Sequence, residues 1–377
     1  MGRSNVALIY WGRRGAMCRL MLEAAQQAAP DIDDLNVLFS LSTTNELYPE
    51  FPPLGNRLLP VDTFRSAPDV LFKALRIFQV RRKLIRWLTK NDVKSVVVLM
   101  PHIWTPLIAD SIKRERIHYA VVVHDATPHP GDPTALFTNW LLNDARAADT
   151  VFTLSNWVAS QLIARRTVPP ERIKTLFMPD VLFPAASHTG ARRQRENGQP
   201  LRILFFGRML QYKGLHLFTE AMEILAAERV PIKISVCGKG GLGRMASRLA
   251  NLGAAIKNRW LSDAEVGQLL ASHDLVVLTH TEASQSGAIA AALGAGVPVV
   301  TTPVGGLAEQ VQSRGAGLVA ERVDARAIAD CIRDLASDHA RYNAIVDQIC
   351  SGRDFSVARF VRELVAALPV HGRNPVG

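Results

Sequence analysis

Short hydrophobic runs recur along the chain, separated by longer segments in which apolar residues return every three or four positions. Such runs are typical of strands buried on both faces of a parallel sheet, and the intervening periodicity is typical of helices that cover the sheet. In the first half of the chain, the expected strands are VALIYWG, LNVLFSL, SVVVLM, YAVVVHD and TVFTLS. The pattern therefore predicts an α/β architecture with parallel strands.

This alternation is interrupted once and then restarts. Residues 183–200 lack periodicity and concentrate Pro, Gly, Ser and Arg, as a linker does. Beyond them, LRILFFG, IKISVCG, LVVLTH and VPVVTT predict a second parallel sheet. We therefore expect an N-terminal α/β domain over residues 1–182 and a C-terminal one over 201–354. We expect the helical segment over 355–377 to pack back on the first domain.

Composition narrows the class of protein. The chain has 377 residues, of which 48% are hydrophobic and 21% charged, and it has no apolar run near the 18 or so residues that span a bilayer. Its N-terminus runs directly into the first expected strand without the pattern of a signal peptide, so we expect a cytoplasmic protein. The four cysteines lie far apart, which predicts reduced structural residues rather than a zinc site or a disulfide scaffold.

The net charge of +10 is concentrated in residues 71–90, LFKALRIFQVRRKLIRWLTK. Cations such as Lys83, Arg86 and Lys90 recur there at helical spacing, opposite an apolar side, so the segment predicts a basic amphipathic helix. Two interpretations stay open: a surface helix with solvated cations, or contact with an anionic membrane surface by a peripheral protein. No zinc-finger or RNP-like motif appears, so nucleic acid is not an expected partner.

A glycine run follows the strand IKISVCG. Gly238, Gly240 and Gly243 have the G-x-G-x-x-G spacing of a dinucleotide-binding turn. That turn requires an acid at the end of the next strand, about 20 residues further on. The nearest candidate, Asp263, follows Ser262 in what reads as a helix start. We therefore interpret the run as a strand-to-helix turn rather than a nicotinamide site.

Two strand ends in the second half carry residues suited to phosphate. Arg208 and Lys213 follow Gly207 at the end of LRILFFG, and two cations there suggest a polyphosphate ligand. The alternative is a solvated arginine and a helix-capping lysine. Glu282 follows the strand LVVLTH, and a small-residue helix begins just after it, where free N–H groups suit phosphate but ordinary capping is also common. The residues at this helix start are Ser284, Gln285, Ser286 and Gly287.

The stretches FFGRMLQYKGL, EASQSG and GAGVPVVTTPVGGLAE, in this order, resemble the retaining glycosyltransferases of family 4. The resemblance covers the whole chain and is strongest over residues 201–311. It implies the GT-B fold, in which two Rossmann-like domains face each other across a cleft and the C-terminal domain binds a nucleotide-sugar donor. It also implies that Arg208 and Lys213 contact the donor diphosphate and that Glu282 binds the donor sugar.

Further donor contacts follow from the same resemblance. It implies that the Ser286 and Gly287 amides contact phosphate or sugar, with Gly207, Gly238, Ser284 and Gln285 lining the site. The sequence departs from the family at one point. Where family members carry a second Glu that binds the nucleotide ribose, this chain has Ala290 and Ala291. The nucleotide base is therefore not predicted.

Strand ends of the first half supply candidates for the acceptor. His124 and Asp125 end the strand YAVVVHD, and His129 follows. A strand-end histidine is often structural, but the resemblance implies that His124 lies beside the donor sugar, so we count it as catalytic. Asp125 and His129 are candidates for acceptor binding.

Two more loops belong to this group. Gly12, Arg13, Arg14 and Gly15 follow the first strand, where family members form part of the acceptor and phosphate wall. The alternative is that the two arginines are solvated. His102, at another strand end, is a further acceptor candidate and could stack on a sugar together with Trp104.

We therefore expect a retaining transfer from a nucleotide-diphosphate sugar to a carbohydrate or lipid-linked acceptor, in cell-surface polysaccharide or glycolipid assembly. The scheme needs no metal and no cofactor besides the donor, and no DxD-like acidic pair is found at a strand end. Two alternatives stay open. One is a nucleotide-sugar epimerase, and the other is a non-catalytic nucleotide-sugar-binding or membrane-associated subunit of the same fold.

Overall fold

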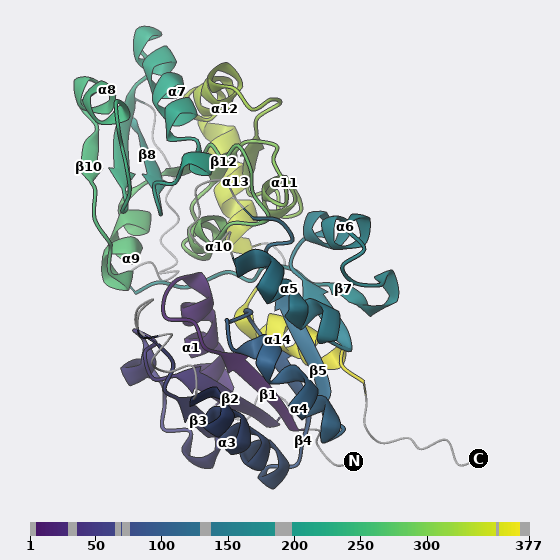
Figure 1. Ribbon diagram of the computed structural model, residues 1–377. Helices are drawn as coiled ribbons and strands as arrows, with labels where there is room; N and C mark the ends of the chain where they lie inside the picture. Colours follow the sequence, from purple (N-terminus) through teal and green to yellow (C-terminus); the bar gives the residue numbers. More distant parts are fainter. Residues whose placement is uncertain are drawn as a thin grey trace. The chain divides into compact units, whose positions relative to one another are not determined.

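The computed structural model describes residues 5–28, 36–64, 69, 76–128, 137–184, 198–351 and 354–369. The chain forms two compact units, each built on one parallel sheet (Figure 1). The first unit comprises Met1–Thr127, Leu136–Pro179 and Ser356–Gly377, and the second comprises Pro128–Ala135 and Asp180–Phe355.

The sheet of the first unit has seven strands in the order β3-β2-β1-β4-β5-β6-β7, and every neighbouring pair is parallel. The chain first moves outward from β1 to β3 and then in the other direction from β4 to β7. The direction reverses between β1 and β4, and open α/β sheets bind ligands beyond the carboxyl ends of strands at such a switch point. The strands are β1 (Asn5–Tyr10), β2 (Asn36–Ser42), β3 (Leu58–Val61), β4 (Val93–Val98), β5 (His118–Val123), β6 (Thr150–Thr153) and β7 (Ile173–Thr175).

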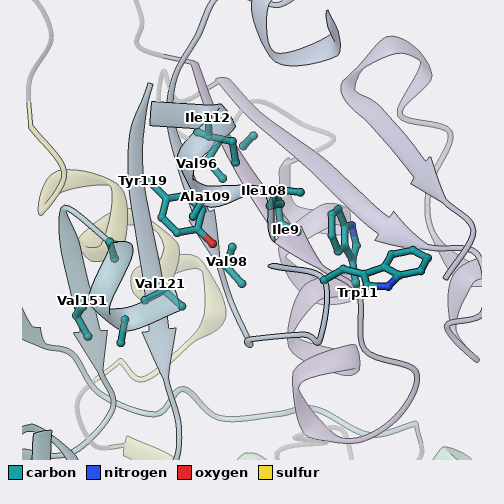
Figure 2. Packing of buried hydrophobic residues seen from close by; sticks show 14 of the residues in the cluster. Ile9, Trp11, Val96, Val98, Ile108, Ala109, Ile112, Tyr119, Val121 and Val151 are labelled. Atoms are coloured by element: carbon teal, nitrogen blue, oxygen red, sulfur yellow. The ribbon is translucent and has the colours of Figure 1, made fainter. Parts of the chain in front are cut away.

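Helices cover both faces of this sheet. One face carries α3 (Arg76–Lys90), α4 (Ala109–Arg114), α5 (Thr138–Ala147) and α6 (Asn156–Ala164). Figure 2 shows part of the core under them, where Ile9 of β1, Val98 of β4 and Tyr119 of β5 pack with Ile108 and Ile112. The other face carries α1 (Ala16–Ala28), against which packs α14 (Val357–Ala366), the last helix of the chain.

The sheet of the second unit has six parallel strands in the order β10-β9-β8-β11-β12-β13. Its switch point lies between β8 and β11, so the loops that follow these two strands leave the same edge of the sheet at neighbouring positions. The strands are β8 (Leu201–Phe206), β9 (Ile232–Cys237), β10 (Ala255–Lys257), β11 (Leu275–Leu278), β12 (Val299–Thr301) and β13 (Gly317–Val319).

Two hydrophobic clusters fix the helices of the second unit on its sheet. Side chains of β8 alternate between them, with Ile203 in one cluster and Leu204 in the other. The first face carries α7 (Leu215–Ala227), α8 (Met245–Asn251), α12 (Ala325–Ser337) and α13 (His339–Ser351). The second face carries α9 (Asp263–Ser272), α10 (Gly287–Gly294) and α11 (Leu307–Gln312).

The basic amphipathic helix predicted over residues 71–90 corresponds to α3, which runs from Arg76 to Lys90 in the described part of the chain. Its buried residues are Ile77, Leu84 and Leu88, on the side opposite most of its cations. Residues 71–75 lie outside the described residues. Across the described helices, none combines the length and the apolar character that a bilayer crossing requires.

Candidate functional site

The loops that follow β8 and β11 are joined to each other by hydrogen bonds at the switch point of the second sheet. Lys213 ends the short 3-10 helix η6 (Gln211–Lys213), and its Nζ lies 2.7 Å from Nε2 of His280. The backbone N–H of Thr281 donates to the carbonyl of Tyr212 at 2.8 Å. A cation of the first loop is thereby held against the second loop.

His280 was not a candidate from the sequence. Its side chain is buried with 1% exposure, and its carbonyl accepts a hydrogen bond of 2.6 Å from the Thr302 hydroxyl. A charged lysine can only donate, so Nε2 of His280 accepts and the ring is neutral with its hydrogen on Nδ1. Nζ of Lys213 also lies 5.0 Å from the ring centre of Tyr212. The ammonium group thus lies against two rings, and a histidine two residues after a buried strand was the signal available in the sequence.

Gly214 links η6 to α7 in a conformation that requires glycine. Its φ is +68°, and a Cβ there would lie 1.8 Å from the carbonyl oxygen of Thr279. The Thr279 hydroxyl donates to the Gly214 carbonyl at 2.8 Å. The backbones of the two loops are therefore in direct contact at Gly214 and Thr279. This contact fixes the position of Lys213, the residue before Gly214.

Arg208 is exposed and follows Gly207 at the end of β8. This segment is bonded to the glycine run, because the amide of Met209 donates to the Lys239 carbonyl at 2.9 Å. A Cβ at Gly238 would lie 1.8 Å from the Gly207 carbonyl oxygen. The run thus lets two strand-end loops pack closely.

The helix start predicted at Ser262 is confirmed, and it belongs to α9. Ser262 caps it and forms a capping box with Glu265. Asp263 is therefore a residue of the first helical turn, and the residue that follows β10 is Asn258 rather than an acid.

The start of α10 is held by a residue that sequence reasoning missed. The amide of Ser286 donates to Oε1 of Gln310 at 2.8 Å, and Nε2 of Gln310 donates back to the Ser286 carbonyl at 3.3 Å. The Ser286 hydroxyl accepts from the amide of Ala288. The Ser286 amide, which the resemblance implied as a ligand contact, is therefore committed to Gln310. Among the described residues, the amide of Gly287 has no acceptor, so it can donate to a ligand.

The other predicted residues of this loop divide by exposure. Glu282 is exposed, Ser284 is fully buried and Gln285 is half-buried. Ala290 and Ala291 are almost fully buried, and the Ala290 carbonyl accepts from the amide of Val181 at 3.1 Å. A carboxylate at either position would be buried against the packed chain, which is costly unless the carboxylate is paired.

In the first unit, His124 lies directly after β5 and is buried with 9% exposure. Its Nε2 lies 2.8 Å from the carbonyl oxygen of Leu99, so the hydrogen is on Nε2 and is donated to the end of β4. Burial lowers the pKa of His124, although this hydrogen bond and Asp125 act in the opposite direction. His124 is thus a neutral, oriented imidazole, and Asp125 beside it is exposed.

His102 lies within an aromatic cluster after β4. Its ring stacks on Phe64 with centres 4.9 Å apart and meets Trp11 and Trp104 edge-on at 6.0 and 5.8 Å. Burial lowers the pKa of His102 to about 3, so the ring is neutral. Trp104 is only 3% exposed, so the prediction that it stacks on a sugar is wrong.

Trp140 is an exposed aromatic residue that contacts this loop. It lies in α5 with 38% exposure, and its indole N–H donates to the Ile103 carbonyl at 2.9 Å. Sequence reasoning missed it, because nothing in TNWLLNDARA separates it from an ordinary helix residue.

The loop after β1 is compact. A Cβ at Gly12 would lie 2.5 Å from the Tyr10 hydroxyl, and Gly15 has a φ of +99°. Arg14 forms an ion pair with Glu46, and the amide of Glu46 donates to the Arg13 carbonyl at 3.1 Å. An acid not considered from the sequence thus offsets the charge of Arg14. The remaining acceptor candidate, His129, lies outside the described residues.

Comparison with known proteins gives matches of two kinds. A family model described as "Glycosyl transferases group 1" matches residues 200–338, the part of the chain that carries the bonded loops. The chain is 27% identical over 242 residues to the putative colanic acid biosynthesis glycosyltransferase WcaL of Salmonella typhimurium. It is 30% identical over 168 residues to a D-inositol 3-phosphate glycosyltransferase of Corynebacterium urealyticum. These matches cover 59% and 40% of this chain, and the chain spans 57% and 40% of the two relatives.

Among solved structures, the chain is similar to HepE of Anabaena in complex with UDP-glucose. The TM-score is 0.67 at 18% identity, and the match covers 97% of this chain and 100% of HepE. At this identity the likeness shows the fold alone. The predicted GT-B class of fold, built from two Rossmann-like α/β units, is confirmed, and so is the resemblance to group 1 glycosyltransferases.

Proposed function

We propose that this protein is a glycosyltransferase that moves a sugar from a nucleoside-diphosphate sugar to a carbohydrate or lipid-linked acceptor. The observation that carries the proposal is the bonded pair of strand-end loops, in which Lys213 is held by His280 at a switch point. Arg208 lies in the loop that follows β8, at the same edge of the sheet. This is the position at which open α/β sheets bind nucleotides.

Departure of the nucleoside diphosphate is the demanding step, because negative charge grows on the phosphate as the glycosidic bond breaks. A cation about 4 Å from that charge contributes roughly 4 kcal/mol at an effective dielectric of about 20. Arg208, Lys213 and the amide of Gly287 at the start of α10 are the groups proposed to stabilise it. Cations that are already fixed in place need no reorganisation when the charge develops.

We propose retention of the anomeric configuration and a metal-independent reaction, as in the family that the chain resembles. The acceptor attacks the face that the diphosphate leaves, and the departing phosphate takes its proton. Glu282 would hold the donor sugar through hydrogen bonds. His124 would orient the sugar or the acceptor. Its ring is itself held in a fixed orientation, because Nε2 donates to the Leu99 carbonyl.

The acceptor is proposed as a class of molecule, a carbohydrate or a lipid-linked acceptor. The name of WcaL refers to colanic acid, a polysaccharide, and HepE was crystallised with UDP-glucose. The name of WcaL fits a role in cell-surface polysaccharide or glycolipid assembly, and the HepE complex fits a nucleotide-sugar donor. The cation-rich helix α3 fits a peripheral position on an anionic cytoplasmic membrane face.

Thermal-shift titration with UDP, GDP, ADP and their sugar conjugates tests the donor site. We expect one base to stabilise the protein, by about 2.7 kcal/mol at a hundred times its dissociation constant. Lys213→Ala should abolish this shift and lower transfer to a membrane-lipid extract by about 100-fold or more. Lys233→Ala is the matched control, because Lys233 is an exposed lysine at the start of β9, the other end of the sheet.

Either of two kinds of result would contradict the proposal, one from the variant and one from the products of the wild-type reaction. One is a Lys213→Ala variant that folds by circular dichroism and transfers sugar at the wild-type rate. The other is conversion of the nucleotide sugar to an epimer, or no turnover at all, when acceptor and donor are both supplied.

A further inference from the structure

A pocket of about 310 Å³ lies between α3 and α4 of the first unit. Helix α3 contributes Arg81, Arg82, Ile85 and Arg86, and the facing helix and its end contribute Ser111, Arg114 and Glu115. Arg82 and Arg86 are one helical turn apart, so they point to the same side of α3. Four arginines, three from α3 and Arg114 at the end of α4, therefore line one space.

These arginines differ from many others in the protein in their surroundings. Arg76 pairs with Asp62, Arg248 with Glu223, and Arg333 with Glu228. The pocket arginines, by contrast, have no carboxylate within ion-pair distance in the described ranges of the chain. Glu115 is the one acid of the lining, and it pairs with none of them among the described residues. Four arginines against one glutamate give the lining a net charge of +3.

Like charges one turn apart on a helix repel each other. Four cations and one acid around this pocket leave an excess of positive charge, which an anion entering the pocket would offset. Guanidinium groups bind phosphate through two parallel hydrogen bonds, and the Ser111 hydroxyl supplies one more donor. The chemistry of the pocket selects a phosphate group.

The surface around the pocket indicates where that phosphate comes from. Helix α3 carries six cations and no acid over residues 76–90. Phe78 is 53% exposed, one turn before Arg82, and the guanidinium of Arg81 lies 5.4 Å from its ring centre. An exposed aromatic residue beside a continuous cationic surface suits the interface of an anionic bilayer, whereas a single soluble phosphate would need neither.

We propose that the pocket formed by Arg81, Arg82, Arg86 and Arg114 binds the phosphate of an anionic phospholipid headgroup, with Phe78 entering the bilayer interface beside it. This deepens the proposed membrane contact of α3 by assigning it a specific site. It does not depend on which donor the second unit takes.

Co-sedimentation of the full chain with vesicles tests the site. The vesicles are phosphatidylcholine alone, or phosphatidylcholine with phosphatidylglycerol. We expect binding to the anionic vesicles only, and a loss of about tenfold in Arg82→Gln/Arg114→Gln. The matched control is Lys83→Gln/Lys90→Gln, which removes the same charge from α3 at exposed positions that do not line the pocket. The control should lose clearly less.

Three results would overturn the proposal. Equal losses in the two double variants would mean diffuse attraction without a site. Failure of the wild-type protein to bind anionic vesicles would exclude an anionic phospholipid as the ligand of the pocket. Binding of glycerol 3-phosphate that Arg82→Gln/Arg114→Gln abolishes, without vesicle binding, would assign the pocket to a soluble phosphate. Donor thermal shifts, measured in parallel on the same variants, separate these results from failure of the transferase proposal.

Discussion

At the scale of single residues, the hydroxyl of Thr105 indicates the protonation state of a buried acid. It lies 2.9 Å from the His102 amide and 2.7 Å from the His102 carbonyl oxygen, and it is also hydrogen-bonded to Oδ2 of Asp144. A hydroxyl has one hydrogen, so it cannot donate to both the carbonyl and an ionised carboxylate. A protonated Asp144 satisfies all three contacts, because it donates to Thr105 while Thr105 donates to the carbonyl. Consistently, burial raises the pKa of Asp144 to about 7, although its hydrogen-bonding contacts with Thr105 and Tyr119 lower that pKa.

Asp144 should therefore make stability fall as pH rises. Between the ordinary pKa of 3.8 and about 7, the folded state binds more protons at Asp144 than the unfolded state, and above that range the contribution is constant. The loss could reach roughly 4 kcal/mol. In urea unfolding series from about pH 5 to about pH 8, Asp144→Asn should become more stable relative to wild type as pH increases. A difference that does not change with pH would contradict the assignment.

His280 is expected to act by positioning Lys213. Removing the acceptor in His280→Ala should lower kcat about tenfold, since Lys213 is no longer held where charge develops. His280→Gln offers an amide oxygen to the same ammonium group and should restore part of the rate. If both variants fold and lose the same activity, His280 supports the fold rather than the lysine.

At the scale of elements, the strands that the sequence did not reveal are the edge strands. β3 and β7 border the first sheet, and β10 and β13 border the second. They have three or four residues each, and β7 and β10 contain exposed positions. Interior strands are buried on both faces and appear as hydrophobic runs, whereas edge strands need no such run. Pattern reasoning therefore identified the centre of each sheet and missed its borders.

The same contrast holds for the candidate site. Strand ends can be predicted, so Arg208, Lys213 and Glu282 were placed in the correct loops, while their roles stay predictions. His280 and Gln310 act through contacts with residues 67 and 24 positions away. Such contacts depend on how loops pack in three dimensions, and periodicity along the chain carries no information about them.

Gly214 gives a prediction at this scale, because it joins η6 to α7 where two loops touch. Gly214→Ala combines a φ of +68° with a contact of 1.8 Å to the Thr279 carbonyl, so the loops must separate. We expect a loss of more than about 2 kcal/mol in the free energy of unfolding. Gly253→Ala is the control, with a similar φ of +73° and no atom within 4 Å, and should cost only about 1 kcal/mol. Equal losses of stability in the two variants would show that the close contact between residue 214 and Thr279 is relieved without a cost in stability.

At the scale of the whole molecule, the two units repeat one arrangement. Each sheet reverses direction once, beside its first strand in chain order, and each places candidate residues just beyond that reversal. The main segment of the second unit runs from Asp180 to Phe355, and its two ends are joined by a hydrogen bond. The amide of Asp180 donates to the Phe355 carbonyl at 2.9 Å. Arg314 pairs with Asp180 and lies 3.7 Å from the ring centre of Phe355.

The position of α14 has a consequence for biosynthesis. This helix follows the second unit along the sequence, yet it belongs to the first unit, where it packs on α1. Its Val357, Phe360 and Leu364 are buried. During synthesis the first unit therefore cannot complete its fold until the whole second unit has been translated. In that interval the apolar surface that α14 covers stays exposed, which favours aggregation of the incomplete first unit.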